Sequence, residues 1–123
     1  MNYTILIADD EPEIRTLLRL YLEYEYYQII EAENGKQALE LLKKDHVDLF
    51  LLDIMMPEMD GYEATKRIRN LDDARADIPI VAMTANAFEE DRQKALENGM
   101  NAHVSKPIDM NMLFKVMAQI LKK

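Results

Sequence analysis

Five side chains that carry acid, hydroxyl or amine groups stand at or just after the ends of apolar runs: Asp9, Asp10, Asp53, Thr84 and Lys106. A carboxylate at the end of a buried strand is costly unless something pairs with it, so Asp53 is the residue most in need of partners. Three carboxylates at one site would raise one another's pKa unless a cation bound among them. Oxygen ligands without a nearby His or Cys suit a hard ion, and Mg²⁺ fits best.

Two of these residues would add other chemistry to the acids. Lys106 carries a compact ammonium group that can neutralise a phosphoryl oxygen, and Thr84 offers a hydroxyl donor. Taken alone, Asp9-Asp10 could equally be a helix N-cap pair, and Lys106-Pro107 could be an ordinary loop dipeptide. These residues indicate a functional site only if the fold brings them to one place.

The predicted elements do bring them together. Short apolar runs predict five strands, at residues 3–8, 28–32, 47–53, 78–83 and 102–104. They alternate with five helices, at about 12–23, 34–42, 60–71, 86–97 and from 109 onward. This alternation predicts a parallel sheet covered on both faces, a three-layer α/β sandwich. Ligands of such sheets bind at the carboxyl ends of the strands, where all five reactive residues stand.

Residue patterns also predict where helices begin and end. Pro12 suits a first helical turn, and Asn34, Asp60 and Asn86 are each followed three residues later by Gln or Glu, as in a capping box. Asn98-Gly99 predicts a left-handed helix end.

The first helix should lay an apolar stripe on the sheet. Its members are Ile14, Leu17, Leu18, Tyr21 and Leu22. The nearby tyrosines are expected in the core and rim of that helix: Tyr21, Tyr24, Tyr26 and Tyr27.

Composition excludes several classes of function. The chain has 123 residues, of which 49% are hydrophobic, and we expect residues 1–123 to form a single domain. A formal net charge of −8 argues against nucleic acid or an anionic membrane as partner and favours proteins or a cation. No signal peptide and no stretch of transmembrane length is recognised, which predicts a cytoplasmic protein. With three glycines and no cysteine, the chain cannot build a P-loop, a GxGxxG site or a thiolate centre.

The motifs together resemble the receiver domains of two-component response regulators, over essentially the whole chain. The resemblance rests on four segments: Asp9-Asp10-Glu11-Pro12, Asp53 with Met56-Pro57-Glu58-Met59-Asp60-Gly61, Thr84-Ala85 and Lys106-Pro107. Residues 83–88 and 105–109 look especially like receivers of hybrid histidine kinases. The resemblance implies a flavodoxin-like sheet in the order 2-1-3-4-5 with five helices.

The family also implies roles for the site residues. Asp53 would accept a phosphoryl group from a phosphohistidine, assisted by Mg²⁺ and Lys106. Asp9, Asp10 and Asp53, with the backbone carbonyl of Met55, would hold the metal. Thr84 and the side chain at position 103, here His103, would form the switch. Such a domain catalyses only its own phosphorylation and slow dephosphorylation and is not an enzyme in the usual sense.

Partners follow from the same resemblance. The expected donor is a histidine kinase or a histidine phosphotransfer domain. The expected target is a protein that contacts the face built by the fourth helix, the fifth strand and the last helix. The chain would act as a monomer or as a phosphorylation-dependent dimer.

Two departures from the family pattern and two rival functions bear on this hypothesis. Position 103 is commonly Tyr or Phe in the family, and Tyr26 stands where Gly is common. A receiver-like module that binds without phosphorylation would need neither Lys106 nor both acids. A phosphatase of the haloacid dehalogenase type would carry a second Asp two residues after the nucleophile, where this chain has Met55.

Overall fold

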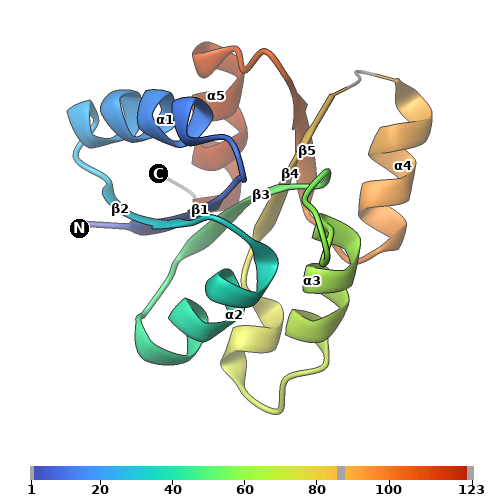
Figure 1. Ribbon diagram of the computed structural model, residues 1–123. Helices are drawn as coiled ribbons and strands as arrows, with labels where there is room; N and C mark the ends of the chain where they lie inside the picture. Colours follow the sequence, from blue (N-terminus) through green and yellow to red (C-terminus); the bar gives the residue numbers. More distant parts are fainter. Residues whose placement is uncertain (1, 86–87, 122–123) are drawn as a thin grey trace.

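Each apolar run predicted to be a strand lies in one parallel sheet. The computed structural model describes residues 2–85 and 88–121. The strands are β1 (Thr4–Ala8), β2 (Gln28–Ala32), β3 (Leu49–Asp53), β4 (Ile80–Thr84) and β5 (Ala102–Ser105). Their order in the sheet is β2-β1-β3-β4-β5, and all four neighbouring pairs are parallel, as predicted (Figure 1).

Five helices cover the two faces of the sheet. They are α1 (Pro12–Tyr24), α2 (Gly35–Lys44), α3 (Gly61–Arg69), α4 (Glu89–Glu97) and α5 (Met110–Leu121). Figure 1 shows α1 and α5 on one face and α2, α3 and α4 on the other. Because side chains alternate along a strand, Ile5 and Ile7 of β1 pack in the core under α1 and α5, and Leu6 packs in the opposite core. The three-layer sandwich is therefore confirmed.

The predicted caps at Asn34 and Asp60 and the predicted turn at Gly99 are confirmed, whereas α4 begins at Glu89, later than predicted, with Phe88 as its N-cap. Oδ1 of Asn34 accepts a hydrogen bond from the Gln37 amide at 2.8 Å, and Oδ1 of Asp60 accepts one from the Glu63 amide at 2.9 Å. Gly99 ends α4 with a φ of +94°, in the left-handed region. The predicted cap Asn86 lies outside the described residues.

The prediction for the tyrosines near α1 was wrong for three of the four. Tyr27 is buried, but Tyr24 is 82% exposed, Tyr26 is 84% exposed, and Tyr21 is also exposed. The stripe that faces the sheet has a spacing of four residues and consists of Ile14, Leu18 and Leu22. Leu17 and Tyr21 lie on the flank of that stripe and remain exposed, because α1 is apolar over a wider arc than the sheet covers.

The connection from α3 to β4 also differs from the prediction. A 3₁₀ helix, η1 (Ala74–Asp77), occupies the polar segment, and β4 begins at Ile80, two residues after the predicted start. The Arg69 guanidinium donates to the carbonyls of Ala76 at 2.7 Å and Ile78 at 2.8 Å. These carbonyls are therefore satisfied by a side chain rather than by a strand ladder. Among the described residues, no helix is both long and apolar enough to cross a lipid bilayer.

Candidate functional site

Three carboxylates meet at the carboxyl end of the sheet. Asp9 follows β1 and is fully buried, Asp10 is exposed, and Asp53 ends β3 with 3% of its surface exposed. One oxygen from each lies within 4.8 Å of the others. The amide of Asp9 still donates to the Ala32 carbonyl of β2, and the Glu11 amide donates to Oδ1 of Asp9 at 2.9 Å. The chain thus turns from strand to helix with the acidic pair at the sheet edge.

Asp53 sits between one cation and one backbone donor. Its Oδ1 accepts a hydrogen bond from the Met55 amide at 3.1 Å, and its Oδ2 lies 3.4 Å from Nζ of Lys106. Burial raises the pKa of Asp53 to about 6, and the charge of Asp9 adds to this rise, whereas Lys106 and the Met55 amide oppose it. Asp53 is therefore ionised at neutral pH but is held in an unfavourable environment.

Lys106 is the cation of the site. Its Nζ lies 2.8 Å from Oδ2 of Asp9, 3.4 Å from Asp53 and 3.8 Å from Oε1 of Glu11. Burial lowers the pKa of Lys106, but the hydrogen bond to Asp9 and the charges of Asp53 and Glu11 outweigh burial, so its pKa is raised. The ammonium group stays charged and bridges the two buried acids.

The predicted switch residues lie on β4, which neighbours the strand of Asp53, and on β5, the edge strand beyond it. Thr84 is the buried last residue of β4, and its carbonyl accepts a hydrogen bond from the Lys106 amide at 2.7 Å. His103 is half-buried in β5 and pairs with Ala82. Val104 belongs to the core under α1 and α5, so its neighbour His103 faces the side of α4.

The loop after β3 is held in place by close backbone approach. The Gly61 amide donates to the Ile54 carbonyl at 3.0 Å. A Cβ atom at Gly61 would lie 2.8 Å from the Cα of Ile54 and 2.9 Å from the carbonyl oxygen of Asp53. Met55 in this loop is 72% exposed. A side chain at position 61 would thus displace the backbone that carries Asp53.

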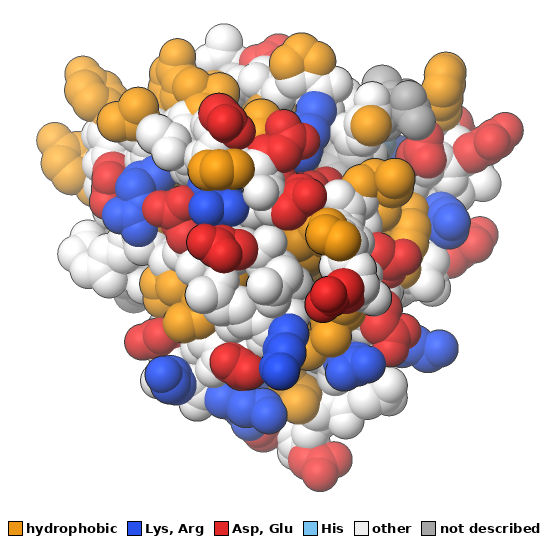
Figure 2. All heavy atoms as spheres, viewed as in Figure 1, with side chains coloured by type: hydrophobic (Ala, Val, Ile, Leu, Met, Phe, Trp, Pro, Cys, Tyr) orange, Lys and Arg blue, Asp and Glu red, His pale blue; other side chains and the backbone are white. Residues whose placement is uncertain are grey.

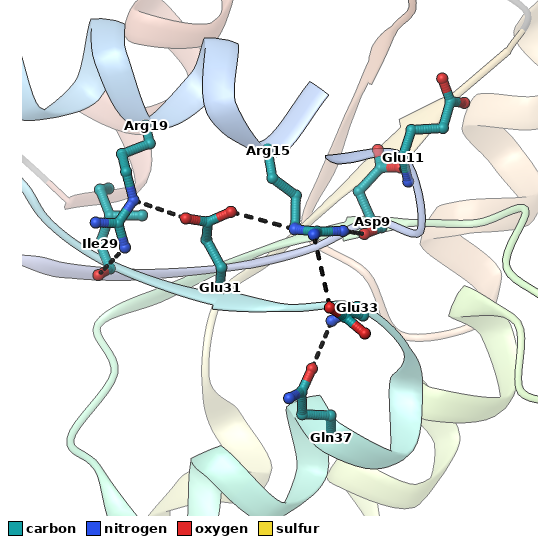
Figure 3. Close-up of polar contacts among 8 residues, drawn as sticks. All are labelled: Asp9, Glu11, Arg15, Arg19, Ile29, Glu31, Glu33 and Gln37. Carbon is teal, nitrogen blue, oxygen red and sulfur yellow. Dashed lines mark hydrogen bonds and ion pairs between the residues drawn. The ribbon is translucent and has the colours of Figure 1, made fainter. Parts of the chain in front are cut away.

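Sequence reasoning missed two residues that touch the acidic pair. Glu11 contacts both Asp9 and Lys106. Arg15 on α1 donates to the Asp9 carbonyl at 2.6 Å (Figure 3). The one available indication was the spacing of Arg15 and Arg19, which places two cations on one helix face four residues apart. Their shared partner, Glu31 in β2, is distant in sequence.

The site fits a hard divalent cation. Its ligand atoms are carboxylate oxygens, and within the described chain no His or Cys belongs to the cluster. Oδ2 of Asp9 is buried, and the nearby positive charge in this structure is the Lys106 ammonium group at 2.8 Å. In Figure 2, acidic side chains crowd the region between the start of α1 and the loop before α3, whereas basic side chains gather lower down, over α2 and α3.

The chain is similar to known signalling proteins. The family described as the response regulator receiver domain matches residues 5–118. An uncharacterized 14.6 kDa protein encoded in the sodA1 3′ region of Leptolyngbya boryana is 44% identical over 94% of this chain and 87% of that protein. The sensor histidine kinase RcsC of Escherichia coli K12 is 42% identical over 89% of this chain, which spans only 11% of RcsC.

A solved structure supports the same assignment and bears on the metal. The receiver domain of the sensor histidine kinase PA1611 from Pseudomonas aeruginosa PAO1 has a TM-score of 0.88 and 30% identity, and all of each chain is covered. That structure has a magnesium ion coordinated in its active site cleft. Because the family model matches residues 5–118, this chain belongs to the response regulator receiver domain family.

Proposed function

We propose that this protein is a phosphorylation-operated switch in which Asp53 accepts a phosphoryl group from a phosphohistidine. The observation that carries the proposal is the environment of Asp53. Its carboxylate is buried between the Lys106 ammonium group and the Met55 amide, inside a cluster with Asp9 and Asp10. A carboxylate whose charged form is destabilised by burial, and which lies at the carboxyl edge of a sheet, is a candidate nucleophile.

In the proposed step, an Asp53 carboxylate oxygen attacks the phosphorus atom. The new bond joins that oxygen to phosphorus, and the bond from phosphorus to the donor imidazole nitrogen breaks, with its electron pair returning to the ring. Lys106, at 3.4 Å from Asp53, is placed to balance the charge of a phosphoryl oxygen. The pKa of about 6 leaves Asp53 ionised at neutral pH, as a nucleophile requires.

The metal in this proposal is Mg²⁺. The carboxylates of Asp9, Asp10 and Asp53 and the backbone carbonyl of Met55 would hold it. When bound, Mg²⁺ supplies positive charge that offsets the repulsion between the acids and the incoming phosphoryl oxygens.

The proposed output is a change in surface contacts. Thr84 would turn its hydroxyl group to the phosphoryl group, and His103 would move with it toward the interior. Because His103 lies on the α4 side of β5, the surface built by α4, β5 and α5 is the one expected to change. A downstream protein would bind that surface, and the donor would be a histidine kinase or a phosphotransfer domain.

Phosphotransfer from a labelled donor tests the proposal. A phosphotransfer domain carrying radiolabelled phosphohistidine is mixed with wild type or with Asp53→Asn in the presence of Mg²⁺. We expect the label to move to wild type, to survive acid and to be released by hydroxylamine, as an acyl phosphate is. Label of the same chemistry on Asp53→Asn would show that another residue is the acceptor.

A further inference from the structure

We infer that Arg15 is a positioning residue that holds the Asp9–Asp10 turn in the shape that binds the metal. The inference rests on the proposed Mg²⁺ site, because the residues that Arg15 positions are ligands only there. It assigns a function to a side chain of α1 that the sequence alone does not single out. Its support is the set of contacts shown in Figure 3.

The Arg15 guanidinium reaches three residues at the ends of β1 and β2. Nη1 donates to the Asp9 carbonyl at 2.6 Å, Nε donates to Oε1 of Glu31 in β2 at 3.1 Å, and Nη2 lies 4.0 Å from Glu33. The Arg15 side chain is only 11% exposed. A charged side chain buried to this degree keeps a fixed geometry, since every alternative rotamer would give up these contacts.

The carbonyl that Arg15 binds sits at a sensitive point of the backbone. Asp9 lies one residue past the end of β1, and its amide still pairs with Ala32 of β2. Its carbonyl belongs to the peptide unit that joins Asp9 to Asp10. Fixing that unit fixes the backbone directions of both residues, and hence the positions from which their two carboxylates reach the metal.

The contribution of Arg15 is geometric rather than a matter of charge alone. Glu31 and Glu33 lie beside the guanidinium and balance its charge. The planar guanidinium donates at once to the Asp9 carbonyl and to the Glu31 carboxylate, and so fixes the position of that carbonyl relative to β2. A Lys ammonium at the same place keeps the charge but cannot make this pair of contacts in the same geometry.

Arg19 offers a matched control within the same network. Its Nε donates to Oε2 of Glu31 at 2.7 Å, and its Nη2 donates to the Ile29 carbonyl at 3.2 Å. In the described part of the chain, its hydrogen bonds and ion pairs do not reach the acidic cluster. Arg19 therefore shares with Arg15 the helix, the Glu31 partner and a backbone carbonyl contact, but not the contact with Asp9.

The experiment compares wild type, Arg15→Lys and Arg19→Lys in the absence of phosphoryl donor. Calorimetry measures the dissociation constant for Mg²⁺, and amide hydrogen exchange of metal-free protein follows the Glu11 amide, which is bonded to Asp9. We expect Arg15→Lys to weaken Mg²⁺ binding about tenfold and to speed exchange at Glu11, and Arg19→Lys to change affinity by less than about twofold.

The outcomes separate this inference from the proposed function. If wild type binds Mg²⁺ and both variants bind it as tightly, Arg15 has no positioning function, while the metal site stands. Equal weakening in both variants would also overturn the inference, because the effect would then come from the shared Glu31 contact. If wild type itself binds no Mg²⁺, the metal site and the inference built on it both fail.

Discussion

Nζ of Lys106 lies 2.8 Å from Oδ2 of Asp9. This distance is shorter than the 3.4 Å from the same Nζ atom to Asp53. Before phosphorylation, the cation of the site therefore pairs more closely with a proposed metal ligand than with the proposed phosphoryl acceptor. Lys106 and the proposed Mg²⁺ would thus compensate the same buried negative charge, and each should matter more when the other is missing.

Replacing Lys106 should lower the free energy of unfolding more without Mg²⁺ than with it. Without Mg²⁺, Lys106→Met leaves Asp9 and Asp53 buried without their cation, and we expect the free energy of unfolding to fall by about 2 kcal/mol at pH 7.5. Saturating Mg²⁺ should recover much of this loss. Urea unfolding with and without Mg²⁺ measures both, with the exposed Lys66→Met as control. A loss that Mg²⁺ leaves unchanged would contradict the compensation.

The raised pKa of Asp53 predicts that the ionised Asp53 side chain lowers the free energy of unfolding at neutral pH. Its pKa rises from 3.8 to about 6 on folding, so the folded state is favoured while Asp53 is protonated and loses that advantage as pH rises between these values. We therefore expect Asp53→Asn to raise the free energy of unfolding by about 2 kcal/mol at pH 7.5 without Mg²⁺, and by almost nothing below pH of about 4. Denaturant unfolding across this range provides the measurement. A gain independent of pH would show that it does not arise from ionisation.

Gly61 should tolerate no side chain, because the clash would involve backbone. Gly61→Ala places a Cβ atom 2.8 Å from the Cα of Ile54. At Gly35, by comparison, the nearest atom would be the flexible Sδ of Met59, at 3.0 Å. We expect Gly61→Ala to lower the free energy of unfolding by about 2–3 kcal/mol and to slow phosphorylation of Asp53, with a smaller effect of Gly35→Ala. Equal effects of the two substitutions in urea unfolding and phosphorylation assays would argue against a specific backbone clash.

Two helices end in the same backbone motif, one at Tyr26 and one at Gly99. The φ angles are +69° and +94°, and in both turns the next amide reaches back to close the helix. A tyrosine adopts this left-handed conformation only with steric strain, whereas a glycine adopts it freely. The exposed side chain of Tyr26 contributes little packing in return. We expect Tyr26→Gly to stabilise the protein by about 0.5–1 kcal/mol, and Gly99→Ala to destabilise it. Thermal unfolding checks both signs, and a destabilising Tyr26→Gly would mean that the tyrosine ring makes a contribution of its own.

The sequence was sufficient for features that depend on local patterns. Apolar runs placed the five strands, and the caps at Asn34 and Asp60 and the turn at Gly99 were correct because neighbouring residues determine them. Parallel topology then brought Asp9, Asp10 and Asp53 together, because the carboxyl ends of parallel strands share one edge of the sheet.

What the sequence could not show depends on contacts between distant segments. The fork from Arg15 to Glu31 and the Asp9 carbonyl joins α1, β2 and the end of β1, and helical periodicity identifies only a polar face. The same limit explains the error at Tyr21 and Tyr24, because the hydrophobicity of α1 does not reveal how wide an arc the sheet covers. The 3₁₀ helix η1 was not predicted, because the Arg69 side chain that satisfies its Ala76 carbonyl and the following Ile78 carbonyl lies in another element, α3.

The most direct test of the central claim is intact-mass measurement after incubation with a small phosphoryl donor such as acetyl phosphate. Wild type and Asp53→Asn are compared with Mg²⁺ and with a chelator. The account predicts one added phosphoryl group on wild type with Mg²⁺, and none on wild type with chelator or on Asp53→Asn in either buffer. Equal labelling of wild type and Asp53→Asn, or full labelling without a divalent ion, would contradict it.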